Sequence, residues 1–145
     1  MPGEIYVIDT NVLLRHSSRE LPRRRLLSAV VVQEMAAGAD SDADLRRWAA
    51  TLRDYRTRDQ LLTPDGEDWY EAGKILNALI RGKRSWRAGR TSAISREEQQ
   101  RLLRDVLIAR SARRVNAVVV TYNAGDFRKI RRFCDVRVIA PADLF

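Results

Sequence analysis

The sequence predicts an α/β fold, a three-layer sandwich with a central parallel sheet of about five short strands flanked by helices. Short apolar runs recur along the 145 residues, and stretches with the spacing of amphipathic helices lie between them. Strands that alternate with helices are joined by right-handed crossovers, which make the sheet parallel. The chain has the length of one ordinary domain, so we expect residues 1–145 to form a single domain.

The first half of the chain carries two strand–helix boundaries. The apolar run "IYVI" stops at Asp9, and the apolar pair at 26–27 leads into Ser28, a residue type that caps helix N-termini. The helix "AVVVQEMAAG" then ends at Gly38, although its three valines are equally compatible with a strand. The expected elements are a strand at 5–8, a helix at 10–17, a strand at 26–27, a helix at 29–38 and an amphipathic helix at 44–55.

The second half repeats this alternation. Thr63–Pro64 has the form of a helix start with proline in the first position, and "SREE" from Ser95 has the form of a capping box. The run "AVVVT" is the clearest buried strand in the chain. The expected elements are a strand at 61–62, a helix from 63 to about Gly82, a basic loop at 83–94, a helix from 96 to about Arg114, and strands at 117–121 and 135–140.

The composition is basic, because 27 Lys and Arg residues against 19 Asp and Glu residues give a net charge of +8. A surplus of this size favours polyanionic partners such as nucleic acids. A general arginine bias would also produce it, since lysine occurs only at positions 74, 83 and 129. Clustering favours the first interpretation, because basic residues crowd the segment around Trp86. The candidate nucleic-acid-binding residues are Arg81, Lys83, Arg84, Trp86, Arg87 and Arg90.

Nothing in the sequence indicates export or a membrane span. No segment approaches about 18 consecutive apolar residues. The chain enters "IYVI" without the basic region, apolar core or cleavage site of a signal peptide. Cys134 is the only cysteine, which excludes an intrachain disulfide and a cysteine-based zinc site. We therefore expect a cytoplasmic protein.

Acidic and amide side chains follow the predicted strands. Asp9 comes directly after the first strand, Glu34 lies on the helix after the second, and Asn123 and Asp126 follow the strand that ends at Thr121. Ligands bind beyond the carboxyl ends of parallel strands, so these side chains belong to one edge of the sheet. A carboxylate between two apolar runs, as in "YVIDTNVLL", is costly unless it is exposed, paired or held by a cation.

Asp105 lies within a predicted helix and needs a separate argument. At 100° per residue it is about 60° from Leu102, at the border of the apolar stripe and beside small alanines. Such a carboxylate either faces a cleft or pairs with Arg101 or Arg104. Glu34 is similar, since it shares a helix face with apolar valines. A set of carboxylate and amide oxygens without imidazole or thiolate is the type of site that Mg²⁺ or Mn²⁺ prefers.

Other function classes lack their motifs. A phosphoacceptor receiver domain needs an aspartate after the third strand and a lysine after the fifth, and "LLTP" and "VIAP" supply neither. A haloacid-dehalogenase-type phosphatase needs Asp-x-Asp after the first strand, where "DTN" has one acid. Neither a glycine-rich dinucleotide fingerprint nor a P-loop is present.

The ordered set of motifs resembles the PIN-domain nucleases, in particular the VapC-like toxins of bacterial and archaeal toxin–antitoxin pairs. The resemblance rests on "VIDTNVLL", "LSAVVVQEMAAG", "LLRDVLIARSARR" and "AVVVTYNAGDF", and it covers essentially the whole chain in the right order. Carried over by position, it makes Asp9, Glu34 and Asp105 the first three acids. Asn123 stands at the fourth position and Asp126 is the next acid, so the residue that completes the site stays open.

The resemblance implies a PIN-like fold and an endoribonuclease that uses Mg²⁺ or Mn²⁺ to hydrolyse RNA phosphodiester bonds. Thr10 and Asn11 match the polar pair that orders the first acid, and Thr121 matches a hydroxyl that lines the site. The implied catalytic acids are Asp9, Glu34, Asp105 and Asp126, and the implied metal ligands are these four and Asn123.

The resemblance also implies partners. These are a substrate RNA, a cognate antitoxin that blocks the acidic cleft, and a second copy of the chain in a homodimer. The basic segment would follow RNA phosphates, while Trp86 either stacks on an unpaired base or packs against the core or a dimer interface. The alternative function is a non-catalytic PIN-like module that binds RNA or protein, which Asn123 at the fourth acidic position favours.

Overall fold

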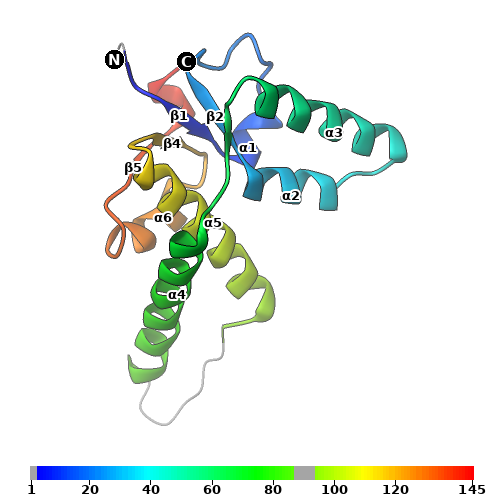
Figure 1. The fold of residues 1–145 in the computed structure, drawn as a ribbon. Helices are drawn as coiled ribbons and strands as arrows, with labels where there is room; N and C mark the ends of the chain where they lie inside the picture. Colours follow the sequence, from blue (N-terminus) through cyan, green and yellow to red (C-terminus); the bar gives the residue numbers. More distant parts are fainter. Residues whose placement is uncertain (1–2, 87–93) are drawn as a thin grey trace.

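The computed structural model describes residues 3–86 and 94–145, and its centre is a five-stranded sheet (Figure 1). The strand order is β3-β2-β1-β4-β5, and every neighbouring pair is parallel. All five carboxyl ends therefore lie at the same edge. The predicted parallel sheet is confirmed. Its strands are β1 (Tyr6–Ile8), β2 (Arg25–Ser28), β3 (Leu61–Leu62), β4 (Val118–Val120) and β5 (Arg137–Ile139).

Alternate strand residues face two apolar layers. On one face, Val7 and Val119 join the larger core, to which helices α2, α4, α5 and α6 contribute. On the other face, Ile8 and Val120 pack against a smaller cluster that includes Val12 of α1. The helices are α1 (Thr10–Leu13), α2 (Ala29–Ala37), α3 (Asp42–Thr57), α4 (Gly66–Trp86), α5 (Arg96–Arg114), α6 (Ala124–Arg131) and the short 3-10 helix η1 (Pro141–Asp143).

The capping residues act as the sequence predicts. The Ser28 hydroxyl accepts a hydrogen bond from the Val30 N–H at 3.2 Å, and α2 ends at its cap, Gly38. The valine run is therefore helical, and the strand alternative is wrong. The Ser95 hydroxyl likewise accepts from the Glu98 N–H at 3.1 Å at the start of α5.

Helix α1 is much shorter than the expected helix at 10–17. It ends at Leu13, and the next residue, Leu14, is 65% exposed, so the apolar stripe does not continue. The Ser17 N–H donates to the Glu20 carboxylate at 2.8 Å instead of to a helical carbonyl. A local bond from side chain to backbone of this kind competes with helix formation.

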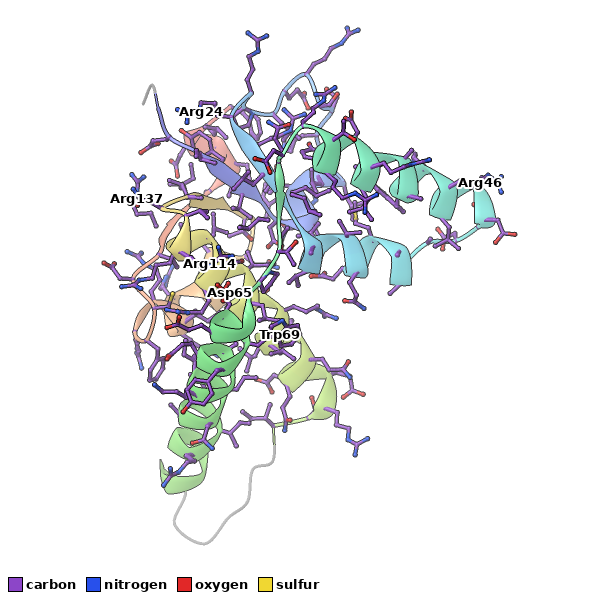
Figure 2. All side chains as sticks on the ribbon, in the orientation of Figure 1. Arg24, Arg46, Asp65, Trp69, Arg114 and Arg137 are labelled. Carbon is purple, nitrogen blue, oxygen red and sulfur yellow. The ribbon has the colours of Figure 1, made fainter. Side chains whose placement is uncertain are left out.

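The surface carries arginines on several sides of the molecule. Figure 2 shows Arg24, Arg46 and Arg137 on widely separated parts of the outer surface, and all three are exposed. Positive charge is therefore distributed over the protein rather than confined to the segment around residue 86. No helix among the described residues has the length and apolar character needed to cross a membrane.

Helix α4 differs from its prediction at both ends. It begins at Gly66 rather than at Thr63–Pro64, because Asp65 and Asp68 cap it reciprocally: each carboxylate accepts from the other residue's N–H, at 2.8 and 3.0 Å. It also passes Gly82 and runs to Trp86, so the expected loop at 83–94 is wrong over its first four residues. One helical glycine costs only about 1 kcal/mol, which the packing of α4 against α5 offsets.

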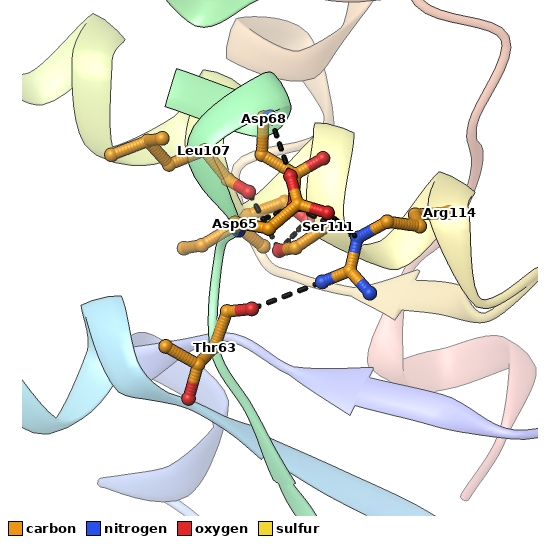
Figure 3. A network of polar contacts seen from close by, with 7 residues as sticks. Thr63, Asp65, Asp68, Leu107, Ser111 and Arg114 are labelled. Carbon is orange, nitrogen blue, oxygen red and sulfur yellow. Dashed lines mark hydrogen bonds and ion pairs between the residues drawn. The ribbon is translucent and has the colours of Figure 1, made fainter. Parts of the chain in front are cut away.

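An ion pair between the exposed Arg114 and the buried Asp68 fixes the start of α4 against the end of α5 (Figure 3). The Arg114 Nε donates to the Asp68 Oδ2 at 3.0 Å and lies 3.3 Å from the Asp65 Oδ2. A second guanidinium nitrogen donates to the Thr63 carbonyl at 3.0 Å. The Asp68 side chain is fully buried. This contact holds in place the helix on which Asp105 lies.

Candidate active site

Asp9 leaves β1 at the carboxyl edge of the sheet and caps α1. Its side chain is buried, with 6% of the residue exposed, and it accepts hydrogen bonds from the Thr10 N–H at 2.8 Å and the Thr121 hydroxyl at 2.7 Å. Burial raises the pKa of this carboxyl group, and the two hydrogen bonds oppose that effect. Asp9 is therefore held in one orientation without a cationic partner of its own in these contacts.

Thr121 and Asn11 connect the β4–α6 turn to Asp9. The fully buried Thr121 hydroxyl donates to Asp9 and accepts from the Asn123 N–H at 3.0 Å. The Asn11 Oδ1 accepts from the Tyr122 N–H at 3.2 Å. Asn11 thus orders the turn and acts on Asp9 only through it, whereas Thr10 binds Asp9 through its backbone.

Glu34 lies on α2, half-buried, and faces two neighbours of opposite charge. Burial raises the pKa of its carboxyl group most, and the nearby Asp9 raises it further. The Arg104 guanidinium lowers it, since the Arg104 Nε lies 3.6 Å from the Glu34 Oε1, and the Thr10 hydroxyl lowers it slightly. The Thr10 oxygen is itself buried without a well-oriented hydrogen bond.

Asp105 is the most perturbed acid of the group. The pKa of Asp105 is raised to about 8, most of all by burial and then by the carboxylates of Asp9, Asp126 and Glu34 in that order. The charge of Arg104 lowers it by less. Arg104 forms its ion pair with Glu34 and also acts on Asp105 through its charge, so it is shared between the two acids rather than paired with Asp105 alone. Asp105 thus faces the other acids.

The fourth position is divided between two residues at the start of α6. Asn123 is the N-cap of α6, but its side chain makes no capping hydrogen bond and the residue is exposed. Asp126 lies in the first turn, is half-buried, and is the second of the three carboxylates that raise the pKa of Asp105. The structure thus brings Asp126 into electrostatic contact with Asp105, and the choice between Asp126 and Asn123 for the fourth position stays a prediction.

The chemistry of this acidic cluster, defined as Asp9, Glu34, Asp105 and Asp126, fits a divalent cation. Within residues 3–86 and 94–145, no three Asp, Glu, His or Cys side chains are arranged as they stand to ligate one ion together. Mg²⁺ does not need such a cage, since it keeps several waters and is commonly held by one or two carboxylates. Asp9, Asp126 and Glu34 each raise the pKa of Asp105, so a cation that offsets this negative charge is favoured at the site.

The basic segment is only partly described by the structure. Arg81 is exposed near the end of α4, and the backbone of Lys83, Arg84 and Trp86 continues that helix. Arg87 and Arg90 lie outside the described residues. The role of this segment in RNA binding stays a prediction.

Sequence reasoning missed two residues that shape the site. Arg104 was considered only as a partner of Asp105, and Tyr122 was not considered. The only signal for Arg104 was its place next to Asp105 in "LLRDV". The signal for Tyr122 was its position between Thr121 and Asn123, two residues that were already candidates for the site.

Residues 6–133 match the PIN domain family, so the chain belongs to this family. Its fold is that of several solved VapBC structures. VapBC-1 from nontypeable Haemophilus influenzae matches with a TM-score of 0.60 and 23% identity, over 95% of this chain and 98% of that chain. DNA-bound VapBC from Salmonella typhimurium matches with a TM-score of 0.58 and 20% identity, over 95% and 98%.

A third similar structure is VapBC-5 from Mycobacterium tuberculosis, a member of the VapBC family of toxin-antitoxin systems. It matches with a TM-score of 0.51 and 20% identity, over 94% of this chain and 98% of that chain. The search of curated proteins gave no significant match. The predicted three-layer, PIN-like α/β fold is thereby confirmed.

Proposed function

We propose that the protein is a metal-dependent endoribonuclease, the toxin of a toxin–antitoxin pair that cuts cellular RNA and so arrests translation. The observation that supports this most strongly is the convergence of four acids at the carboxyl edge of one parallel sheet, where Asp9, Asp126 and Glu34 all act on Asp105. Membership of the PIN domain family and the likeness to the VapBC structures support the same proposal.

Phosphodiester hydrolysis needs a nucleophilic water and a means to stabilise a strongly anionic transition state. When bound, Mg²⁺ or Mn²⁺ lowers the pKa of a water molecule and neutralises charge that develops on the phosphate. Asp9 and Asp105 would hold the ion, directly or through water. Glu34 would either hold it as well or orient the attacking water. Asp126 is our candidate for the fourth acid, with Asn123 able to supply an amide oxygen.

Asp105 also makes cation binding depend on pH. With a pKa of about 8, this carboxyl group carries a proton at neutral pH as long as no cation is present. It must lose that proton before it can hold an ion, so binding is coupled to proton release. The buried Thr121 hydroxyl and the Thr10 N–H keep Asp9 oriented throughout, because both bonds are made to its carboxylate oxygens.

We infer that a cognate antitoxin binds the protein and covers the acidic cluster. An arginine of the chain itself already contacts one of these acids, so the cluster can bind a cationic side chain. The Arg104 Nε lies 3.6 Å from the Glu34 Oε1. An arginine supplied by an antitoxin would compete for the same carboxylates. We expect the toxin to act in the cytoplasm as a homodimer. Light scattering of the purified chain, alone and with a small protein encoded next to it, tests both partners.

The proposed activity is tested with purified protein and a fluorescent single-stranded RNA in Mg²⁺, Mn²⁺ or EDTA. Asp9→Asn and Asp105→Asn should each reduce cleavage by at least about a hundredfold, since even residues that only orient metal ligands contribute about 10- to 100-fold. Asp54→Asn is the matched control, because Asp54 is an exposed acid on α3 paired with Arg58. All variants are purified identically, so that a contaminating nuclease shows equally in each.

Two results would contradict the assignment. Cleavage that survives in both Asp9→Asn and Asp105→Asn would mean that the acidic cluster is not the catalytic site. Tight RNA or protein binding with no cleavage in any metal would favour the non-catalytic module instead.

A further inference from the structure

An aromatic cluster is formed by residues that follow α1, β4 and η1, and it has no place in the hydrolysis proposed above. It comprises His16, Tyr122 and Phe145, which are far apart in sequence. The rings of His16 and Phe145 are stacked with centroids 4.4 Å apart and an interplanar angle of 21°. The rings of His16 and Tyr122 are nearly parallel, at 10°, with centroids 6.0 Å apart. Tyr122 is 41% exposed and Phe145 is 46% exposed, so the cluster presents aromatic surface to solvent.

The ring of Tyr122 is held from several directions. Its hydroxyl makes a 2.5 Å hydrogen bond with the His16 Nε2, and its backbone N–H donates to the Asn11 Oδ1 at 3.2 Å. The Arg15 guanidinium carbon lies 4.6 Å from the Tyr122 ring centroid. His16 is in turn 3.3 Å from the Glu20 carboxylate. A ring fixed in this way loses little conformational entropy when a ligand binds to it.

The position of Tyr122 ties this surface to the acids. The residue before it, Thr121, donates its hydroxyl to Asp9, and the residue after it, Asn123, stands at the N-cap position of the helix that carries Asp126. Tyr122 therefore lies within one residue of groups that contact Asp9 and begin α6, and a nucleic acid strand whose phosphate lies at the acidic cluster can extend to it. Arg15 is exposed and its guanidinium lies over one face of the ring, so a base that stacks on that face takes the place of the guanidinium, which can then bind the strand's phosphates.

We propose that Tyr122, supported by His16 and flanked by Arg15, is a stacking site for an unpaired nucleobase next to the phosphate that is cut. Exposed aromatic rings with adjacent cations are the means by which proteins bind single-stranded RNA, and stacking tolerates any base because every base has a π-face. A cation beside the ring favours a polyanionic strand over a neutral peptide. This inference rests on the proposed function, since it concerns the substrate of that same site.

The test is the affinity for a fluorescent single-stranded RNA, measured by anisotropy in EDTA so that no cleavage occurs. Tyr122→Leu should weaken binding by about 5- to 100-fold, whereas Tyr122→Phe, which keeps the ring, should stay within about fivefold of the wild type. Tyr70→Leu is the matched control, because Tyr70 is an exposed tyrosine on α4 that also lies beside a cation, Lys74. Circular dichroism and thermal midpoints verify that each variant is folded.

A second arm replaces each nucleotide of the RNA in turn with an abasic one. One abasic position should weaken binding to the wild type but not to Tyr122→Leu, which identifies a base that the ring contacts. The proposal would be overturned if Tyr122→Leu and the wild type bound RNA with equal affinity, or if each abasic position weakened binding equally in both proteins. Either result would favour a protein partner as the ligand of the aromatic cluster. Because this experiment measures no cleavage, a protein without nuclease activity could still bind RNA through Tyr122. An active nuclease could likewise fail to show this binding.

Discussion

Asp105→Asn should stabilise the fold when no divalent cation is present. Burial and three neighbouring carboxylates raise the pKa of Asp105 from 3.8 to about 8. Between these values the folded state holds a proton that the unfolded state has released, so the free energy of unfolding falls as pH rises through this window. At about 1.4 kcal/mol for each tenfold change in proton affinity, the full penalty reaches about 6 kcal/mol.

Relaxation of the chain and entry of water reduce that ceiling, and we expect Asp105→Asn to gain at least about 2 kcal/mol at about pH 9 in EDTA. The gain should shrink toward about pH 5.5, where the wild-type carboxyl group is protonated in the folded state. Urea denaturation of both proteins at the two pH values measures it. Asp54→Asn should change stability by less than about 0.5 kcal/mol at either pH, because Asp54 is exposed.

The reasoning would be refuted if Asp105→Asn were less stable than the wild type at about pH 9 in EDTA. Such a result would mean that Asp105 is stabilised in its charged form by the folded protein. The acids would then not repel one another as their positions indicate, and the argument for a cation at this edge would lose its main support.

Two further substitutions and the pH dependence of Mg²⁺ binding test other contacts and charges of the protein. Thr121→Val should lower the free energy of unfolding by about 1.5–3 kcal/mol in urea denaturation, because Asp9 loses a buried hydrogen-bond donor. Thr121→Ser should retain most of the stability, and equal losses in the two variants would contradict this reasoning. Arg114→Met should cost about 2–4 kcal/mol by leaving the buried Asp68 without its cation, and a wild-type midpoint would count against that pair. Calorimetric Mg²⁺ affinity should rise between about pH 6 and pH 8 as Asp105 loses its proton, and a flat profile would argue against Asp105 as a ligand.

The sheet and the acids on it follow closely from local sequence patterns. Asp9 directly follows the apolar run of β1, and Ser28 starts α2, on which Glu34 lies half-buried. The rule that parallel strands present their carboxyl ends at one edge then brings the acids together without knowledge of any contact. The helical position of Asp105 beside alanines left two alternatives open, a side chain that faces a cleft and one that pairs with Arg101 or Arg104.

The contacts that hold the site were not predictable in this way. The Thr121 hydroxyl reaches Asp9 across 112 residues of sequence, and the Asn11 amide reaches Tyr122 across 111. Hydrogen bonds between residues so far apart leave no periodic pattern in one sequence. The predicted start of α4 was wrong for a related reason. The reciprocal caps of Asp65 and Asp68 place this start beyond Pro64, the residue that had indicated it.

The most direct test of the central claim is to sequence the 5′ ends of cellular RNA after brief expression of the wild type and of Asp9→Asn. The account predicts new ends at discrete positions with the wild type, a matching arrest of translation, and neither effect with Asp9→Asn. Identical end profiles for the two proteins, with Asp9→Asn folded and equally abundant, would contradict the claim that this acidic edge cuts RNA.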